Sequence, residues 1–333
     1  MARQGSGKPP RGGGVPRPDD YVPMWLRFKA WWDGTEPEAL TRPGGTAKVG
    51  VKRDAKALHM DSEPPSDPAT WWSPERVEIH GNLWGEGYLE PGGAERVLAL
   101  VKPLALTNQM TVVDVIAGMG GGMRTIVREH GNWMTGLEPN QQLAEMGMAS
   151  SADAKLATRA PVHAYDPAIV NMPERKFDVV LMRDRGFQIK EKRRLLGCIR
   201  KALKPNGYLI LTDLVLADSA APNMSPLSAW IASEVIKVEP WAVRDYRYTL
   251  EETGFEVRQF EDDTDFYRNA AIEGWKMFMK ILQKQQGLSR SYVSTFLQEA
   301  DLWQKRIKAI EAGQLRFLRV QAQNPDRHLL SEW

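Results

Sequence analysis

Short apolar strands alternate with amphipathic helices through the middle of the chain, and this alternation restricts the fold more than any other feature. β-branched, apolar runs predict strands at 111–117, 132–138, 160–166, 177–184 and 208–216. Helical patterns lie between them at 94–104, 123–131, 141–152 and 190–203. This order is typical of a parallel sheet with helices on both faces. Such sheets bind ligands at the carboxyl ends of their strands, where the topology changes direction.

The last third of the chain changes its period. Residues 217–254 and 264–312 carry mostly helical patterns, whereas 254–260 and 314–323 alternate or cluster as strands do. We expect these two segments to be the last two strands of the same sheet, with the helices between them folded over its mouth. The fold class is therefore α/β, a doubly wound, mostly parallel, seven-stranded Rossmann-like sheet with a helical cap from the C-terminal half.

The chain divides into four predicted parts. Residues 1–20 are rich in Gly, Pro and basic side chains and predict a disordered tail. Residues 21–75 form a Trp-rich extension or lid, in which 21–33 has apolar residues at helical spacing and the rest forms a connector with little regular structure. Residues 76–216 form the cofactor-binding core. Residues 217–333 form the acceptor cap and supply the last two strands.

Composition excludes several classes of function. The 333 residues carry a net charge of +2, which gives no general electrostatic case for a nucleic acid partner. No run approaches the ~20 apolar residues of a membrane-spanning helix. Cys198 is the only cysteine, which favours a reducing compartment and a cytoplasmic location. The five histidines lack ligand spacing, so we predict no metal site.

The stretch VVDVIAGMGGGMR, at 112–124, joins the first predicted strand to a helix through a glycine-rich loop. A Walker loop needs Lys and Ser or Thr after its last glycine, but Met123 and Arg124 follow here. A dinucleotide loop needs a third glycine where Met123 stands. An acidic residue followed by a G-x-G turn suits S-adenosylmethionine, which has no pyrophosphate to bind, and Asp114, Gly118 and Gly120 supply that pattern.

Acidic residues at the ends of the next strands support this cofactor. Glu138 ends the second strand, where a carboxylate can accept both ribose hydroxyls. Asp166 ends the third strand, within reach of an adenine amino group. We add Arg183, at the end of the fourth strand, to the predicted cofactor-binding set. Together these positions favour S-adenosylmethionine over the other nucleotide-like cofactors.

Over roughly 94–323 this set resembles the class I S-adenosylmethionine-dependent methyltransferases. Upstream, HGNLWGEGYLEPGG at 80–93 predicts a structured loop and is similar to the stretch before the cofactor loop in phosphoethanolamine N-methyltransferases and related small-amine enzymes. The resemblance implies that Tyr88, His80 and Asp184 are catalytic residues that position or deprotonate the acceptor. It implies in-line methyl transfer to a small molecule, with an amine nitrogen favoured.

The acceptor-binding residues depart from that family. Gln188 stands where the phosphoethanolamine enzymes have a histidine, and their phosphate-binding Tyr and Arg cluster is not evident. We expect Trp84 to offer an aromatic face to the acceptor, and the cluster Arg244, Tyr246 and Tyr248 to grip an anion. The sequence therefore favours methylation of a small acceptor without naming phosphoethanolamine.

Other functions stay open at this point. The acceptor could be a membrane lipid or quinone, recruited by peripheral membrane contact through 21–33, or its acceptor atom could be sulfur or oxygen. A non-catalytic cofactor-binding protein is a third class, because Ile116 stands where the family commonly has glycine. A nucleic acid substrate is disfavoured because RDRG ends the fourth strand, where an Asn/Asp-Pro-Pro-aromatic run would be expected. The chain could also form an oligomer.

Overall fold

The computed structural model describes residues 70–326 apart from residue 286, all within one compact unit that spans Met60–Trp333. The tail predicted at 1–20, the helix at 21–33 and nearly all of the connector lie outside the described residues. In this part of the chain, no helix is both long and apolar enough to cross a membrane.

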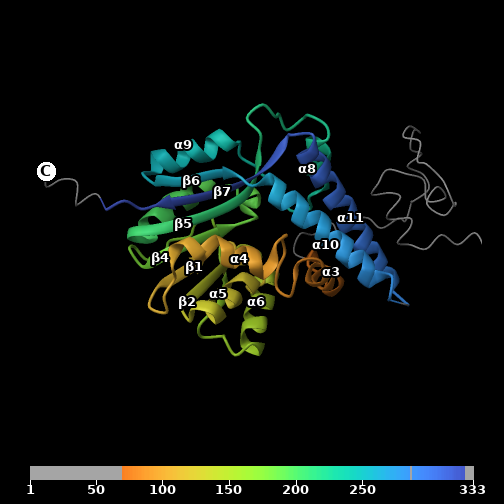
Figure 1. Ribbon diagram of the computed structural model, residues 1–333, viewed down its shortest axis with the longest axis horizontal. Helices are drawn as coiled ribbons and strands as arrows, with labels where there is room; N and C mark the ends of the chain where they lie inside the picture. The colour runs from red at the N-terminus through yellow and green to blue at the C-terminus, as the bar shows by residue number, and fades with distance from the viewer. Residues whose placement is uncertain (1–69, 286, 327–333) are drawn as a thin grey trace, which may run out of the picture. The chain divides into compact units, whose positions relative to one another are not determined.

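Seven strands form one sheet in the order β3-β2-β1-β4-β5-β7-β6. Figure 1 labels all of them except β3. The strands are β1 (Thr111–Asp114), β2 (Trp133–Glu138), β3 (Val162–Ala164), β4 (Phe177–Arg183), β5 (Leu203–Leu216), β6 (Glu256–Asp262) and β7 (Leu315–Gln323). β1 to β5 pair in parallel, whereas β7 is antiparallel to both β5 and β6. The predicted seven-stranded, mostly parallel sheet is confirmed. Its order reverses between β1 and β4, which is where such sheets bind ligands.

Helices cover both faces of the sheet. The helices of this layer are α4 (Gly93–Val101), α5 (Gly121–His130), α6 (Gln141–Asp153), α7 (Lys192–Ala202) and α9 (Val243–Thr253). α4 and α5 share one apolar core with β1, and α7 and α9 share a second core with β4 and β5. The Leu195, Leu196 and Ile199 side chains lie on one face of α7 because residues three and four apart face the same way. The predicted double-wound layering is therefore present.

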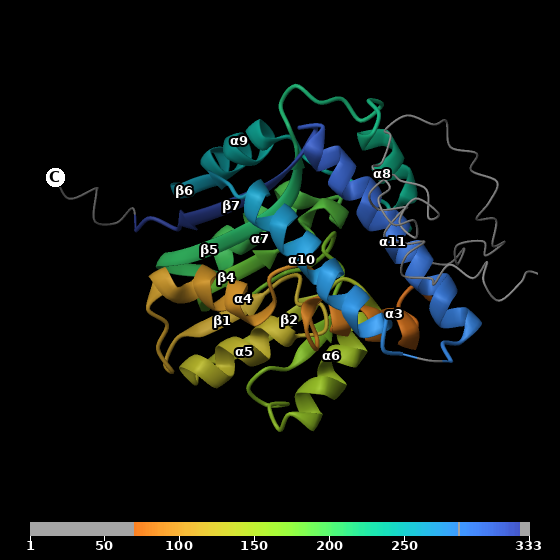
Figure 2. The same ribbon diagram turned by 45° about the vertical axis from the view of Figure 1, so that its right-hand side comes forward.

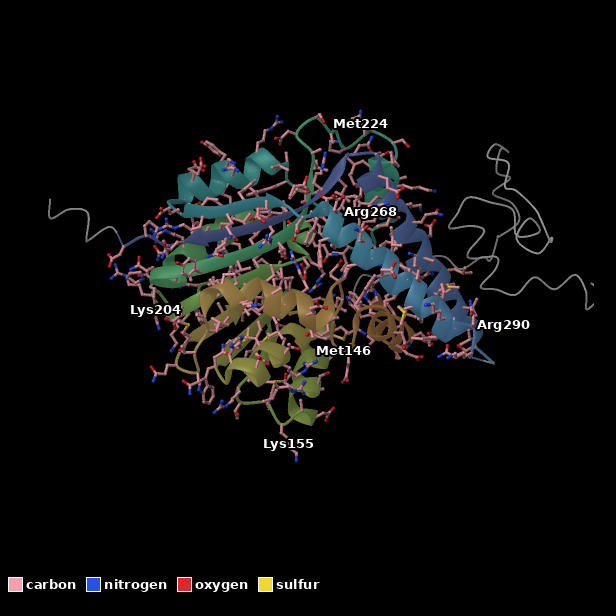
Figure 3. The ribbon with its side chains drawn as sticks, in the orientation of Figure 1. Met146, Lys155, Lys204, Met224, Arg268 and Arg290 are labelled. Carbon is pink, nitrogen blue, oxygen red and sulfur yellow. The ribbon has the colours of Figure 1, made fainter. Side chains whose placement is uncertain are left out.

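Four helices gather beyond one end of the sheet, which Figures 1 and 2 both show. They are α3 (Pro74–Trp84), α8 (Leu227–Ser233), α10 (Thr264–Leu282) and α11 (Arg290–Glu311). α10 follows β6 and α11 precedes β7, so both lie at the edge where the parallel strands end. Figure 3 shows the exposed side chains of Lys155, Met224 and Arg290 at the periphery of the described part of the chain.

The segment 80–93 differs from the predicted loop, since its first five residues complete α3. Ser73 caps this helix by accepting a hydrogen bond from the Arg76 N–H, and Pro74 occupies its first turn, where proline costs no hydrogen bond. Gly81 lies inside the helix with open space where a Cβ would be. α3 packs against α10 and α11. These tertiary contacts stabilise a helix that its glycine-rich sequence does not predict.

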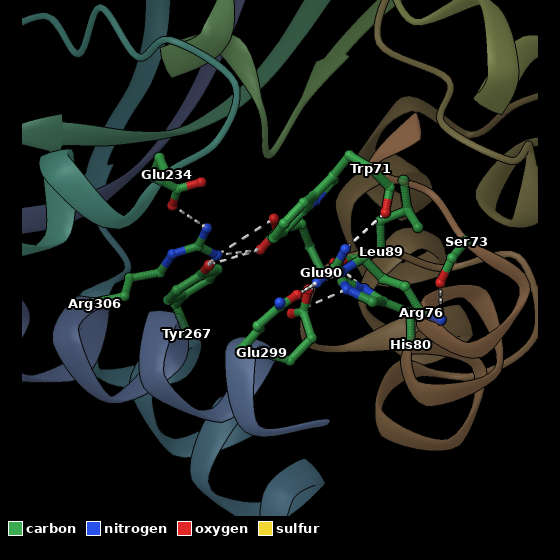
Figure 4. A network of polar contacts seen from close by, with 11 residues as sticks. Trp71, Ser73, Arg76, His80, Leu89, Glu90, Glu234, Tyr267, Glu299 and Arg306 are labelled. Atoms are coloured by element: carbon green, nitrogen blue, oxygen red, sulfur yellow. Dashed lines mark hydrogen bonds and ion pairs between the residues drawn. The ribbon is translucent and has the colours of Figure 1, made fainter. Parts of the chain in front are cut away.

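A buried ionic network joins α3 to α11 (Figure 4). The Arg76 Nε donates to Glu299 Oε1 at 2.6 Å, and its Nη1 donates to the Trp71 carbonyl at 2.7 Å. The His80 Nε2 lies 3.2 Å from Glu299 Oε2. Burial alone would raise the pKa of Glu299, but the charges and hydrogen bonds of His80 and Arg76 lower it to about 2. The carboxylate therefore stays charged inside the protein and holds the two helices together.

We expect Glu299→Gln to flatten the dependence of stability on pH. Because the pKa of Glu299 falls from 4.5 to about 2 on folding, its stabilising effect is present above the ordinary value and is lost as the pH falls toward 2. The variant should lose about 3 kcal/mol of unfolding free energy at pH 7, since Arg76 remains buried without its carboxylate. Between about pH 5 and pH 3 its stability should fall less steeply than that of the wild type.

Urea unfolding followed by circular dichroism at each pH measures these free energies. Glu311→Gln is the matched control, because Glu311 lies at the exposed end of the same helix. Equal unfolding free energies at pH 7, together with parallel pH profiles, for the wild type and Glu299→Gln would show that this network does not stabilise the folded state.

Candidate active site

The glycine loop joins β1 to α5 and brings backbone N–H groups to the carboxyl edge of the sheet. Gly118 and Gly120 adopt positive φ angles of 57° and 72°, which L-residues with a Cβ rarely adopt. Gly121 packs so closely on the preceding loop that a Cβ there would lie 2.6 Å from the Gly87 carbonyl oxygen. The glycines are therefore required by both backbone conformation and close approach.

A buried ion pair supports this loop from below. The Arg183 Nη2 and Nε donate to Asp114 Oδ2 at 2.6 and 3.1 Å, which links the ends of β4 and β1. Burial alone would lower the pKa of Arg183, but the charges of Asp114 and Asp184 raise it. The other carboxylate oxygen accepts the Ile116 N–H at 3.2 Å. Ile116 is buried and lies outside the positive-φ region, so glycine is not required at that position.

The Glu138 carboxylate, at the end of β2, holds three separate segments. Its Oε2 accepts the Gly118 N–H at 2.7 Å and the Arg185 Nη2 at 2.6 Å, and its Oε1 accepts the Asn140 N–H at 3.0 Å. Sequence reasoning placed Glu138 at this strand end but missed Arg185. The only available signal was its position in the RDRG run that follows β4.

Two hollows lie at this edge of the sheet. The glycine-loop cavity has about 30 Å³ for water-sized occupants and is lined by residues that include Tyr88, Glu90, Gly118 and Asp184. The Glu138 groove holds about 550 Å³ and is lined by residues that include Glu138, Asn140, Gln188 and Ile189. Ile116 and Arg185 line both hollows. Glu138 among the predicted cofactor acids, and Tyr88 and Asp184 among the predicted catalytic residues, therefore line hollows that share Ile116 and Arg185.

Asp184 faces the glycine-loop cavity from a strained backbone. Its φ angle is 70°, which is uncommon for a residue other than glycine, and its N–H donates to the Thr212 carbonyl at 2.7 Å. The Thr212 hydroxyl donates to Asp184 Oδ1 at 2.7 Å, so this oxygen is held in place. Burial raises the pKa of the carboxyl, and the Arg183 charge opposes that effect. Asp184 therefore presents a carboxyl group with a raised pKa to a small cavity.

A second buried acid, Glu90, lines the same cavity and was not found from the sequence. Tyr267 donates to Glu90 Oε2 at 2.7 Å, and the Arg306 Nη1 lies 3.2 Å from the same oxygen, as Figure 4 shows. Burial raises the pKa of Glu90, and the charge of Asp184 raises it further, while Arg306 lowers it. The signal in the sequence was its place two residues after Tyr88, in the LEPGG segment that leads to α4.

The third predicted catalytic residue, His80, lies outside this cavity. It does not line the cavity, and its Nδ1 lies 3.2 Å from the Leu89 carbonyl oxygen while its Nε2 faces Glu299. Tyr88 does line the cavity. Its hydroxyl lies 2.5 Å from Thr125 Oγ1 on α5. The structure therefore brings Tyr88 and Asp184 together and directs the His80 ring into the α3–α11 network.

The predicted acceptor-binding residues lie elsewhere. Trp84 is buried against Trp303, with ring centroids 4.8 Å apart, and does not line the glycine-loop cavity. Tyr246 is buried and donates to Asp213 Oδ2 at 2.5 Å. Tyr248 is 61% exposed on α9, and Arg244 lines a separate hollow beside Asp218. The structure does not bring these four residues to the cavity because their segments pack on the sheet or within the cap.

Asp166 follows β3 and is exposed, with its Oδ1 accepting the Ala168 N–H at 2.8 Å. It lines neither the glycine-loop cavity nor the Glu138 groove. Within the described ranges, no group of three or more His, Cys, Asp or Glu side chains is placed to hold a metal ion. The polar groups that converge are carboxylates, which accept hydrogen bonds, and backbone N–H groups, a set that fits an organic cofactor with hydroxyl groups.

Comparison with known proteins places this arrangement in a family. The family model described as "Methyltransferase domain" matches residues 89–259, about half of the chain. The maize "Phosphoethanolamine N-methyltransferase 1" is 25% identical over 71% of this chain, and the match covers 45% of the maize protein. The chain thus spans less than half of the length of that relative.

Solved structures share the fold. The Haemonchus contortus phosphoethanolamine N-methyltransferase 2, solved with S-adenosyl-L-methionine, superposes with a TM-score of 0.68 at 18% identity over 78% of this chain and 59% of that chain. A putative sarcosine dimethylglycine methyltransferase from Galdieria sulphuraria gives a TM-score of 0.63 at 18% identity over 76% of this chain and 99% of that chain. The glycine loop and its strand-end acids lie inside the matched segment, and the chain belongs to the methyltransferase-domain family.

Proposed function

We propose that this protein is an S-adenosylmethionine-dependent methyltransferase whose acceptor is the nitrogen of a small amine. One observation carries the proposal. The half-buried Asp184 and the buried Glu90 present two carboxyl groups to a cavity beside the glycine loop that Tyr88 also lines, and Glu138 lines the adjoining groove. The Haemonchus relative was solved with this methyl donor, which supports the choice of cofactor.

The residues on the donor side fit the cofactor. Glu138 offers carboxylate oxygens at the end of β2, where a ribose can bind, and Gly118 and Gly120 let the backbone approach the ligand. Asp114 and Arg183 hold the loop in this conformation through their buried ion pair. When bound, S-adenosylmethionine supplies an electrophilic methyl group on a positively charged sulfur.

The residues on the acceptor side favour an ammonium group. Asp184 Oδ2 lies 4.0 Å from the Arg183 guanidinium, so its charge is only partly compensated. Glu90 is held by Tyr267 and Arg306 and adds a second carboxyl to the cavity. We assign to Asp184 the binding of the ammonium and the uptake of its proton, which exposes the nitrogen lone pair. Tyr88 orients the acceptor through its ring and hydroxyl.

The relatives support nitrogen as the acceptor atom. The maize and Haemonchus proteins are named as phosphoethanolamine N-methyltransferases, and the Galdieria protein as a putative sarcosine dimethylglycine methyltransferase. Arg96 lines the cavity and is paired with Asp263, so no phosphate-binding site is assigned. With Cys198 as its only cysteine, the chain suits a reducing compartment such as the cytoplasm.

Glu138→Gln should weaken binding of S-adenosylhomocysteine at least about tenfold, because hydrogen bonds to a charged carboxylate are worth ~1.5–3 kcal/mol. Isothermal titration calorimetry measures this affinity. Asp153→Asn is the control, since Asp153 is an exposed carboxylate at the end of α6 and lines neither hollow. If the wild-type protein binds no S-adenosylhomocysteine, the proposed function is wrong.

Asp184→Asn should reduce kcat about 100-fold or more and leave the affinity for S-adenosylhomocysteine nearly unchanged. Transfer of labelled methyl from S-adenosylmethionine is measured across small amines, phenols, thiols, quinols and lipid vesicles. Because burial raises the pKa of Asp184, the rate should still increase with pH above the ordinary carboxyl range.

Asp153→Asn, an exposed change on α6, is the control and should keep the full rate. Transfer to a phenol, thiol, quinol or lipid with none to any amine would contradict the assignment of nitrogen. An unchanged kcat for Asp184→Asn would remove Asp184 from the proton transfer.

A further inference from the structure

Arg185 occupies part of the surface of Glu138 that a ribose would need. A carboxylate has about four lone-pair positions, and three on Glu138 are filled by the Gly118 N–H, the Asn140 N–H and the Arg185 guanidinium. Two of these donors belong to the backbone and are fixed by the glycine loop and the start of α6. Two ribose hydroxyls therefore cannot both bind Glu138 unless the Arg185 side chain leaves.

The position of Arg185 also separates the two hollows. The Arg185 Nη2 lies 3.5 Å from the position that a Cβ on Gly118 would take, so the guanidinium lies next to the glycine loop. Arg185 and Ile116 line both the glycine-loop cavity and the Glu138 groove. Ile116 is anchored in the apolar core, whereas Arg185 reaches the site on a long side chain with several rotatable bonds. Arg185 is thus the movable part of the boundary.

The contacts of Arg185 make this movement feasible. Among the described residues, Glu138 is the one hydrogen-bonding partner of the Arg185 side chain, and the pair is buried. Its backbone N–H donates to the Arg183 carbonyl, so the main chain stays in place when the side chain turns. Exchange of this ion pair for ribose hydroxyls keeps the Glu138 oxygens hydrogen-bonded, and its cost is that the buried Arg185 guanidinium loses its carboxylate partner.

We propose that Arg185 is a gate on the donor site, which occupies Glu138 in the free protein and is displaced by the ribose of the incoming donor. This inference rests on the proposed function, since it takes an adenosyl ligand as the occupant of the Glu138 groove. The gate lowers the affinity for the donor, because each binding event must break the Arg185–Glu138 pair. Arg185 acts on Glu138 and does not take part in proton transfer.

The test compares S-adenosylhomocysteine binding by calorimetry for the full-length wild type, Arg185→Gln and Arg185→Met. Removal of the competing guanidinium should tighten binding about tenfold, the equivalent of about 1.4 kcal/mol. Arg193→Gln is the control, since Arg193 pairs with Glu252 on the exposed surface of α7. Its affinity should equal that of the wild type.

A second readout separates the gate from a general change in stability. Thermal unfolding with and without S-adenosylhomocysteine should show a larger ligand-induced increase in Tm for the Arg185 variants than for the wild type. Equal or weaker binding by both folded variants would overturn the gate while leaving the proposed function intact. Absence of binding by the wild type and both variants would overturn both proposals.

Discussion

The Glu138 carboxylate is the contact on which the arrangement of the site depends. It receives a backbone N–H from the glycine loop, a backbone N–H from the start of α6 and a guanidinium from the segment after β4. Three segments that are distant in sequence are thereby held around one pair of oxygens. Because β1, β2 and β4 are neighbours in a parallel sheet, their carboxyl ends meet at the same edge and make this convergence geometrically natural.

Buried ion pairs connect the cap helices to the loops at the carboxyl edge of the sheet. Arg306 pairs with Glu90 at 3.2 Å and with Glu234 at 2.7 Å, which connects α11 to the cavity loop and to the segment after α8. Burying a charged group is costly unless it is paired, and removal of one partner from a buried pair is strongly destabilising. These pairs fix the position of α11 relative to the loop that lines the glycine-loop cavity.

The sheet, the glycine loop and the strand-end acids could be predicted because each depends on local patterns. Strand period, glycine at a turn and an acid at a strand end are all visible within about ten residues. The position of His80 could not be predicted, since its partner Glu299 lies more than 200 residues away on α11. The position of Tyr246 could not be predicted for a similar reason, because its hydroxyl donates to Asp213 on β5, which is distant in the sequence.

Glu90 and Arg185 show where sequence reasoning ends. Both stand beside residues that the family resemblance identified, Tyr88 and Asp184, but a charged residue in a loop is usually solvated. Only the packed structure shows that each is buried, and that Glu90 lines the glycine-loop cavity while Arg185 pairs with the Glu138 carboxylate.

A crystal structure of the protein with S-adenosylhomocysteine tests the central claim most directly. The account predicts that both ribose hydroxyls bind Glu138, that the Arg185 guanidinium has left it, and that the sulfur faces the cavity of Asp184 and Tyr88. A structure in which the Arg185–Glu138 pair stays intact and the ligand lies away from the glycine loop would contradict it.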